Sequence, residues 1–440
     1  MSRFSNKARR LAISIGTGAW TKDALIDRLD RALDGGSPDP ATIAARLLFH
    51  FDRRQPPSSN ELAAFFESDD LFHVSWDKIE STGSPSILLD APVMAPPPDG
   101  LKTFPLPQLE TSKDVCTWLG LHRHELDWFA DLHGRQATQR NAKLHHYRYR
   151  WIAKPSGERR LIEIPKVRLK TIQRQILKEL LDRVPPHPSA HGFCRRRSCR
   201  SFAQLHTGQP NVLHLDLKDF FHSVPVLRVG ALFRCLGYPH PVARVLQGIC
   251  THATSPNLAA FEQHAPSWHQ RQLLKFKHLP QGAPTSPALA NLCAWRFDHR
   301  LQRLAERHGL NYSRYADDLA ISGGLELAHL SPFLERLIAA IALEEGFRIN
   351  HRKTRLMRES QRQRIAGVVV NQKPNIDRRD FDRLKAILNN CIRFGPASQN
   401  RDAHSDFRSH LAGRIGYVRW LNPDKAQRLQ KLWDRIEWPE

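Results

Sequence analysis

Hydrophobic positions near the N-terminus recur at the spacing of helices. Leu25, Ile26, Leu29 and Leu33 define one helical pattern, and a second pattern begins at residue 39. Residues 93–107 then carry five prolines, a composition typical of a linker. We therefore expect a mainly helical N-terminal extension over residues 1–91 and a Pro-rich linker over residues 92–110.

The rest of the chain mixes strand and helix patterns. Residues 147–154 and 160–165 predict two strands around a turn, and residues 166–184 predict the helix that follows. The remaining predicted elements are a helical stretch at 239–251, an irregular insertion at 252–272, a helix from Pro284 or Pro287 to Gly309, a helix from Pro332 to Glu345, a short strand at 365–370, and three helices within 378–438.

Two short apolar runs predict a β-hairpin whose turn carries paired carboxylates. Residues 310–315 alternate as a strand does, and residues 319–322 form its return. The turn between them contains Asp317 and Asp318. Aspartate is a common turn residue, so this pair alone does not indicate a site. Adjacent carboxylates repel each other, however, and a site built on them needs cations to neutralise them.

A third carboxylate ends an apolar strand about a hundred residues earlier. Residues 212–215 are an apolar run that leads directly into Asp216. If this strand lies beside the hairpin, Asp216 joins Asp317 and Asp318 in one cluster. Three carboxylates on neighbouring strands can hold two metal ions, one to activate an attacking hydroxyl and one to stabilise a leaving phosphate. The pattern therefore predicts a nucleotidyl-transfer site.

Three motifs in this order resemble those of reverse transcriptases. They are the Tyr-Ala-Asp-Asp turn that includes Tyr315 and Ala316, the upstream Asp-x-x-x-Phe-Phe that begins at Asp216, and Leu-Pro-Gln-Gly-Ala-Pro-Thr-Ser-Pro at residues 279–287. The resemblance runs from about Tyr147 to the C-terminus and is greatest to the bacterial retron type. It implies an α+β fold of right-hand polymerase architecture, with fingers, a palm built on a split βαβ sheet, and an α-helical thumb. The corresponding expected boundaries are 111–211 for the N-terminal helices and fingers, 212–372 for the palm with a fingers insertion near 239–280, and 373–440 for the thumb.

The same resemblance implies roles for individual residues. Asp216, Asp317 and Asp318, with Leu217 beside them, are expected to bind two Mg²⁺ ions, for which Mn²⁺ can substitute. The expected nucleotide-binding residues are Lys154, Arg160, Phe220, Phe221, Gln281, Gly282 and Lys353. Among these, Arg160 is expected to grip the triphosphate with help from Lys154, because a guanidinium binds phosphate bidentately.

Two of these roles, those of Phe221 and Lys353, have alternatives. Phe221 is expected beneath the incoming sugar, where its ring would exclude a 2′-hydroxyl, although either member of the Phe220–Phe221 pair can be a core residue. Lys353 resembles a lysine proposed to protonate the leaving pyrophosphate, and a plain phosphate-binding role is equally compatible with the sequence. Two segments, residues 202–206 and 365–367, depart from the usual retron pattern and leave the retron subclass open.

The charge distribution favours a nucleic-acid partner. Residues 1–110 hold 12 Lys/Arg against 15 Asp/Glu, whereas residues 111–440 hold 54 against 29. A folded region with so large an excess of positive charge is suited to binding a polyanion, of which nucleic acid is the leading candidate. Seven scattered cysteines favour reduced thiols in a bacterial cytoplasm, and no run of 18 apolar residues predicts a membrane span. The spacing of His187, His191, Cys194 and Cys199 matches no common zinc site, and the adjacent arginines at 195–197 favour phosphate instead.

We therefore interpret the chain as an RNA-directed DNA polymerase that copies a cognate structured non-coding RNA into cDNA from dNTPs. The retron resemblance adds a role in anti-phage defence, a separate effector protein as a further partner, and no association with membranes. Two alternatives are a reverse transcriptase of the group II intron or mobile-element type and a non-catalytic RNA-binding scaffold. The sequence does not identify the RNA, the priming nucleotide, the effector, the oligomeric state or the role of residues 1–91.

Overall fold

The computed structural model describes residues 3–33, 39–51, 56–70, 85–90, 92–95, 104–139, 141–153, 159–254 and 267–438. The chain divides into two compact units, each built from two separate stretches of sequence. Unit 1 contains residues 1–185 and 221–293, and unit 2 contains residues 186–220 and 294–440.

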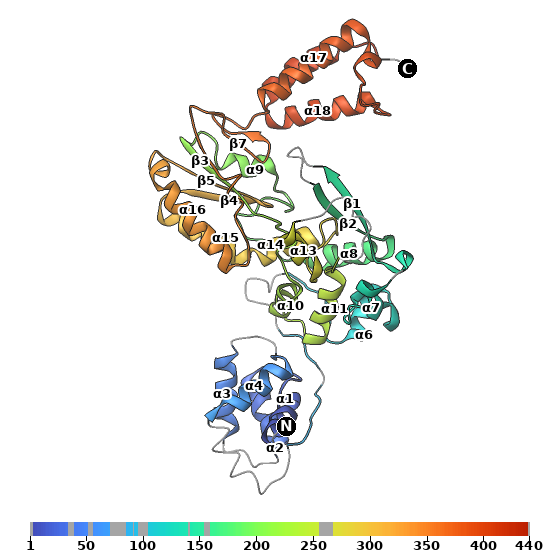
Figure 1. The fold of residues 1–440 in the computed structure, drawn as a ribbon, viewed down its shortest axis with the longest axis vertical. Helices are drawn as coiled ribbons and strands as arrows, with labels where there is room; N and C mark the ends of the chain where they lie inside the picture. The colour runs from blue at the N-terminus through green and yellow to red at the C-terminus, as the bar shows by residue number, and fades with distance from the viewer. Residues whose placement is uncertain are drawn as a thin grey trace. The chain divides into compact units, whose positions relative to one another are not determined.

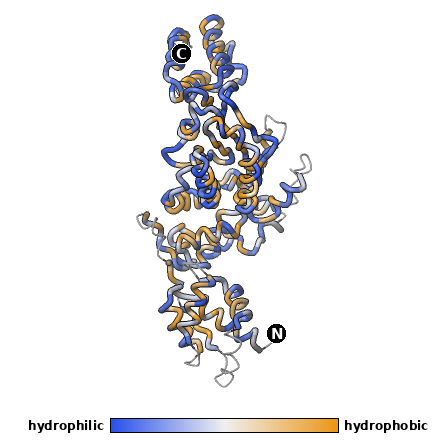
Figure 2. The backbone as a smooth tube through the Cα atoms, turned by 90° about the vertical axis from the view of Figure 1, so that its left-hand side faces the viewer, coloured by the Kyte–Doolittle hydropathy of each residue, from blue (hydrophilic) through white to orange (hydrophobic). Residues whose placement is uncertain are grey.

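Unit 1 begins with four helices that share a core of their own (Figure 1). They are α1 (Arg3–Ile15), α2 (Lys22–Leu33), α3 (Pro40–His50) and α4 (Ser59–Ser68). Asp39 caps α3 and Ser58 caps α4, where Glu61 completes a capping box. Hydrophobic and hydrophilic stretches alternate along these helices (Figure 2), as expected when each helix buries one face.

The described parts of the Pro-rich segment, residues 92–95 and 104–110, pack against the rest of unit 1. The Ala95 amide donates to the Gly237 carbonyl at 2.9 Å, and the Tyr238 hydroxyl donates to the Pro107 carbonyl at 3.1 Å. Gly237 has a φ of 101°, and a Cβ at this position would collide with the Ala95 carbonyl. These parts of the segment are therefore fixed rather than a free spacer.

The remainder of unit 1 is a two-stranded sheet surrounded by helices. Strand β1 (Tyr147–Ala153) pairs antiparallel with β2 (Arg159–Pro165), as the sequence predicts. The helices are α6 (Ser112–Leu119), α7 (Arg123–Ala130), α8 (Val167–Glu179), α10 (Val226–Cys235), α11 (His240–Cys250), α13 (Trp268–Lys275) and α14 (Ser286–Cys293), with short 3₁₀ turns at Arg135–Thr138, Ala142–Leu144 and Leu181–Arg183.

The expected irregular insertion at 252–272 is wrong in its last part. There α13 begins behind a capping box formed by Ser267 and Gln270.

Unit 2 is organised around a four-stranded sheet in the order β4-β5-β3-β6. The strands are β3 (Asn211–Asp216), β4 (Asn311–Tyr315), β5 (Asp318–Gly323) and β6 (Arg355–Arg358). Every neighbouring pair is antiparallel, so β3 and β4 run parallel with β5 between them. The mixture of helices and small antiparallel sheets agrees with the α+β class expected for the chain. Helices α15 (Trp295–Arg307) and α16 (Glu326–Glu344) pack on the sheet (Figure 1). Helix α9 (Cys199–Gln204) packs against β4 and against β8 (Val368–Val369).

Three further predicted elements differ from those observed among the described residues. The helix expected to start at Pro332 begins at Glu326 instead. Pro332 has no N–H to donate to the Ala328 carbonyl, and the Ser331 hydroxyl donates to that carbonyl in its place, so the helix continues through the proline. The single helix expected up to Gly309 is interrupted at Ala294. The Ala294 carbonyl accepts the first backbone hydrogen bond of α15.

The third difference concerns residues 365–370. They do not form one strand, because Ala366 and Gly367 both have positive φ angles, of 42° and 81°. The chain turns there and forms a small hairpin, β7 (Arg364–Ile365) with β8 (Val368–Val369).

Three C-terminal helices complete unit 2 around a separate hydrophobic core. They are α17 (Arg378–Phe394), α18 (Phe407–Leu421) and α19 (Pro423–Trp433), with a 3₁₀ turn at Pro396–Gln399, and they lie within the predicted range. None of the helices in the described ranges combines the length and apolar character that a membrane crossing requires.

Candidate active site

The three predicted carboxylates come together at one end of the unit 2 sheet. Asp216 is the last residue of β3 and lies directly opposite Asp318, the first residue of β5. Because the two residues form a cross-strand pair, their side chains project from the same face of the sheet. Asp317 occupies the hairpin turn between β4 and β5, and its carbonyl accepts from the Leu217 amide at 2.8 Å. Two strands and one turn therefore supply the cluster.

The tip of this hairpin has an unusual backbone. Ala316 has a φ of 56°, a left-handed conformation that a residue with a side chain seldom adopts. The neighbouring loop helps to hold it, because the His191 amide donates to the Arg314 carbonyl at 2.7 Å. Gly192 approaches so closely that a Cβ there would lie 2.5 Å from the Ala316 nitrogen. A larger residue at position 192 would therefore displace the tip.

Lys353 is the main cationic partner of the cluster. Its Nζ donates to Asp216 Oδ1 at 2.6 Å, and the Asn350 side-chain amide donates to Asp216 Oδ2 at 3.2 Å. Partial burial alone would lower the pKa of Lys353, but the hydrogen bond to Asp216 and the negative charges of all three aspartates raise it above its ordinary value. Lys353 is therefore protonated at neutral pH and carries a proton close to Asp216.

His214 contacts the second strand carboxylate. Its Nε2 lies 3.0 Å from Asp318 Oδ1, and its side chain is buried on the carboxylate face of the sheet. His214 lies two positions before Asp216 on β3, so the same strand orients both groups.

Arg314 supports the hairpin from the opposite face of the sheet. This fully buried guanidinium donates to the Ala316 carbonyl at 3.0 Å, and two further N–H groups donate to Asp298 of α15 at 2.7 and 2.6 Å. The Tyr312 hydroxyl donates to Asp298 at 2.8 Å. Sequence reasoning missed Arg314 and Asp298, although a charged residue within an alternating apolar strand was a visible signal.

His206 links the two strands of the hairpin. Its Nδ1 lies 2.7 Å from the Ser322 hydroxyl of β5, and its Nε2 lies 2.7 Å from the Ser313 hydroxyl of β4. Burial lowers the pKa of His206 to about 3, so the ring is neutral at physiological pH. Sequence reasoning treated this residue only as part of a departure from the family pattern, whereas the structure gives it a bridging position.

The oxygen atoms of the cluster are suitable ligands for a divalent cation that prefers oxygen, such as Mg²⁺. The charged ligands available are carboxylate oxygens, which Mg²⁺ and Mn²⁺ prefer. Asp216 is 5% exposed, and the Asp318 side chain is 29% exposed. Carboxylates this close repel each other when ionised, and a divalent cation relieves that repulsion more fully than one lysine does. The residues present therefore fit a metal site.

The remaining predicted residues of unit 2 lie close to the cluster in sequence. Leu217 is buried and forms an isolated antiparallel β-bridge with Ile349. The ring of Tyr315 packs against that of the core residue Phe202. Phe220 is only 4% exposed, with its ring 5.6 Å from that of Phe347. This burial favours the core role for Phe220 over contact with the nucleotide.

The other predicted nucleotide-binding residues belong to unit 1. Arg160 is exposed on β2, and Phe221 is half-buried. Gln281 is half-buried and Gly282 is exposed. Gly282 has a φ of 132°, and a Cβ there would lie 2.7 Å from the Glu163 carbonyl, so contact with β2 already requires glycine at this position. Lys154 lies outside the described residues.

The histidines and cysteines near residue 190 do not form one metal-ligating group in the described part of the chain. His191 Nδ1 lies 2.9 Å from the Ser201 hydroxyl, and Cys194 donates to the Ala190 carbonyl at 3.4 Å. His187 Nδ1 accepts from the Ser189 amide at 3.2 Å.

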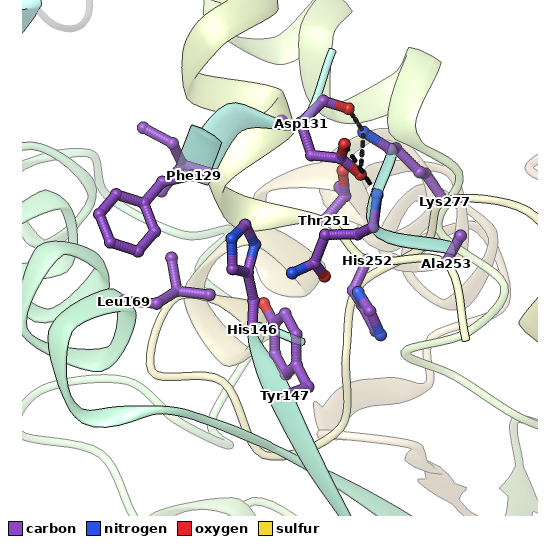
Figure 3. A pocket seen from close by; sticks show the side chains of 12 residues that line it. Phe129, Asp131, His146, Tyr147, Leu169, Thr251, His252, Ala253 and Lys277 are labelled. Carbon is purple, nitrogen blue, oxygen red and sulfur yellow. Dashed lines mark hydrogen bonds and ion pairs between the residues drawn. The ribbon is translucent and has the colours of Figure 1, made fainter. Parts of the chain in front are cut away.

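A small pocket in unit 1 lies beside the start of β1 (Figure 3). His146, Tyr147 and His252 line it, and Lys277 reaches across to hydrogen-bond Asp131 (Figure 3). Its free volume, about 10 Å³, is about that needed by one water molecule. The pocket is therefore too small for a nucleotide.

The chain is similar to known proteins over the segment that carries the three carboxylates. The family model described as reverse transcriptase (RNA-dependent DNA polymerase) matches residues 152–370, which include all three carboxylates. The chain is 39% identical over 336 residues to the retron Mx65 reverse transcriptase of Myxococcus xanthus, covering 75% of this chain and 73% of that protein. It is 32% identical over 296 residues to the retron Ec86 reverse transcriptase of Escherichia coli, covering 66% of this chain and 81% of that protein.

Proposed function

The chain belongs to the retron reverse transcriptases, and we propose that Asp216, Asp317 and Asp318 are the carboxylates with which this RNA-directed DNA polymerase binds two Mg²⁺ ions. The observation that carries the proposal is the cross-strand pairing of Asp216 with Asp318 beside the Asp317 turn. The relatives favour the retron type over the group II intron or mobile-element alternative. The presence of all three carboxylates argues against a non-catalytic scaffold.

The bound ions would activate the primer hydroxyl and stabilise charge on the transferred phosphate. The protein's contribution is to fix the three carboxylates on a rigid sheet. Asp216 and Asp318 are held by strand pairing, and Asp317 is positioned by a turn whose carbonyls accept from Leu217 and Arg314. Mn²⁺ shares the oxygen preference of Mg²⁺ and is the expected substitute.

Lys353 is suited to a proton-donating role. It is protonated at neutral pH and lies 2.6 Å from a proposed metal ligand. A lysine in this position can protonate the leaving pyrophosphate or neutralise its charge. Both roles require the cation to be near the departing phosphates.

We further propose nucleotide-binding roles for residues of unit 1, on the basis of the family resemblance. Arg160 would bind the triphosphate through its planar fork, with Lys154 assisting. Phe221 would lie beneath the sugar and exclude a 2′-hydroxyl. Gln281 would hydrogen-bond near the sugar, and Gly282 would let the backbone approach the template–primer pair.

We assign these parts to a right-hand polymerase. In this assignment the sheet of unit 2 is the palm, β1 and β2 belong to the fingers, and residues 373–440 form the thumb. Residues 348–440 hold 21 Lys/Arg against 10 Asp/Glu, a charge that supports gripping a nucleic-acid duplex. Residues 1–91 form a helical extension with no assigned chemistry.

The proposed partners follow from the family. They are a cognate structured RNA, its cDNA product, dNTPs and a separate effector protein used in anti-phage defence. RNA and dNTPs meet in the bacterial cytoplasm, where we place the protein.

The test is primer extension on an RNA template by the purified full-length protein with Mg²⁺. Asp317→Asn and Asp318→Asn should each abolish cDNA synthesis while leaving RNA binding nearly unchanged, because removing a charge from a repelling cluster does not unfold the sheet. Synthesis at the wild-type rate by either variant would contradict the assignment. A charge-neutralising change at Asp402, an exposed residue remote in sequence from the cluster, is the matched control.

A further inference from the structure

A second group of potential metal ligands lies in unit 1, apart from the carboxylate cluster. Glu163 of β2 meets His278 and His222, which are distant in sequence. Glu163 Oε2 lies 3.1 Å from His278 Nε2 and 3.5 Å from His222 Nε2. The side chains of Glu163, His278 and His222 are 0%, 1% and 11% exposed. A carboxylate so completely removed from water needs a cationic partner.

The hydrogen bonding of His278 restricts what lies between it and Glu163. Its Nδ1 is 2.7 Å from the Phe276 carbonyl, which can only accept, so Nδ1 carries a proton. In the neutral ring, Nε2 then presents a lone pair toward the Glu163 oxygen. Two lone pairs 3.1 Å apart repel each other unless a proton or a metal ion lies between them.

His222 adds a second nitrogen to the same point. Its Nε2 is buried and has no hydrogen-bond partner among the described residues. Buried polar atoms without partners are rare in native proteins, and a missing ion is one established reason for them. Protonation of His278 would satisfy the Glu163–His278 contact but would leave this nitrogen with only a long contact, 3.5 Å, to Glu163 Oε2.

The surrounding groups hold the carboxylate in one orientation. The Thr254 hydroxyl donates to Glu163 Oε1 at 2.7 Å, and the backbone N–H of Gln281 donates to Glu163 Oε2 at 3.3 Å. The carbonyl of Phe276 fixes the ring of His278. Metal sites characteristically have such outer hydrogen bonds, which select the histidine tautomer and orient each ligand.

We propose that Glu163, His222 and His278 bind one Zn²⁺ or a similar first-row divalent ion through two imidazole nitrogens and one carboxylate oxygen. Two histidines and a carboxylate are a ligand set that zinc uses, with a water molecule completing four-coordination. Imidazole ligands favour such ions over Mg²⁺, so this site and the carboxylate cluster would select different metals.

The position of the site indicates a structural role. Glu163 lies three residues after Arg160 on β2, and its amide donates to the Gln281 carbonyl at 2.9 Å. His278 precedes Gln281 by three residues, and His222 follows Phe221. A single ion would therefore join three segments that carry proposed nucleotide-binding residues. Its loss should loosen these segments within unit 1.

The alternative is an ion pair between Glu163 and a protonated His278. Burial lowers the pKa of His278, but the Glu163 charge and hydrogen bond outweigh this effect and raise it overall. This alternative requires no metal.

Metal analysis of the full-length protein distinguishes the two. Protein purified without chelator and dialysed against metal-free buffer should retain about one equivalent of zinc, and reconstitution with Co²⁺ should give visible d–d absorption bands. Zinc X-ray absorption of the wild-type protein should show N/O ligands at about 2.0–2.1 Å with outer scattering from two imidazoles. This measurement depends on no variant, so it applies even if substitutions impair folding.

Variants locate the ion. Glu163→Gln and His222→Gln should each weaken zinc binding by at least tenfold and reduce the zinc-dependent rise in Tm, whereas Asp317→Asn should retain a full equivalent. His329→Gln, on an exposed face of α16, is the matched histidine control and should also retain the metal. Absence of stoichiometric metal in the wild-type protein would overturn the proposal in favour of the ion pair. Full zinc retention by Glu163→Gln and His222→Gln would also overturn it, by placing the metal elsewhere. Neither outcome bears on the Asp216 site.

Discussion

Arg314 and Asp298 form a fully buried bidentate ion pair behind the Tyr-Ala-Asp-Asp hairpin, with N–O distances of 2.7 and 2.6 Å. The same guanidinium donates to the Ala316 carbonyl, next to the proposed metal ligand Asp317. An ion pair with no access to solvent therefore connects α15 to the turn that carries the proposed metal-binding carboxylates. We propose that the pair positions these carboxylates through its contact with the Ala316 carbonyl.

Arg314→Met should destabilise unit 2 by about 3–5 kcal/mol, because it leaves Asp298 buried and unpaired. The triple variant Arg314→Met, Asp298→Leu and Tyr312→Phe removes every polar member of the group and should recover much of that loss. Its cDNA synthesis should nevertheless remain low, because the Ala316 carbonyl has lost its donor. Denaturant unfolding and primer extension measure the two effects, and wild-type activity in the triple variant would exclude a positioning role.

Lys353→Met should reduce the rate of nucleotide addition by about 10²–10⁴-fold if Lys353 protonates the leaving group. Lys353→Arg keeps the positive charge but cannot deliver a proton at neutral pH, because the guanidinium does not deprotonate. Single-turnover extension with both variants separates the two proposed roles. Recovery of the wild-type rate in Lys353→Arg would show that charge alone is sufficient.

His206 should cause the free energy of unfolding to decrease as the pH becomes acidic. Its pKa is about 3 in the folded chain, against an ordinary value of 6.5. Between these values the unfolded chain binds a proton that the folded chain does not, so stability falls as the pH drops through this window. The contribution is at most about 1.4 kcal/mol per pH unit.

His206→Asn should reduce the slope of unfolding free energy against pH between about pH 4.5 and 6.5, whereas the exposed control His329→Asn should change it much less. Urea unfolding at several pH values measures the slope. An unchanged slope in His206→Asn would mean that the ring is already protonated when folded.

Phe221→Ala should raise ribonucleotide incorporation relative to deoxynucleotide incorporation by about ten- to a hundredfold, equivalent to about 1.4–2.8 kcal/mol. The half-buried ring should be lost with a smaller stability cost than the roughly 3–5 kcal/mol of a buried phenylalanine. Paired rNTP and dNTP titrations in single-nucleotide extension give the ratio, with Phe220→Leu as the core control. An unchanged ratio would assign sugar selection to another group.

Deletion of residues 1–91 should leave primer extension on a generic RNA template intact, since helices α1–α4 have their own core. Deletion to residue 108 should instead lower Tm, because it also removes the buried side chains of Met94 and Leu106 and the contacts with Gly237 and Tyr238. Thermal unfolding and activity of both truncations test this. Equal stability of the two would show that the Pro-rich segment contributes nothing.

The sequence pattern alone predicted three strands of the unit 2 sheet and the placement of the three carboxylates at their ends. Alternation over residues 310–322 predicted β4 and β5, and the apolar run before Asp216 predicted β3. Side chains along a strand point alternately to the two faces of the sheet. Once the hairpin is assigned, the face on which each side chain lies therefore follows. The helix at Pro332 was misplaced because local propensity cannot anticipate that Ser331 will satisfy the carbonyl left by the proline.

Only the tertiary structure revealed the groups that join distant segments. Glu163 and His278 are separated by 115 positions, and Asp298 and Arg314 lie on a helix and a strand with different periodicities. No local pattern links such residues, because their proximity results from how separate elements pack. The sequence therefore determined which residues carry the reverse transcriptase motifs, whereas packing decided which buried charges support the Asp317 turn and which side chains converge on Glu163.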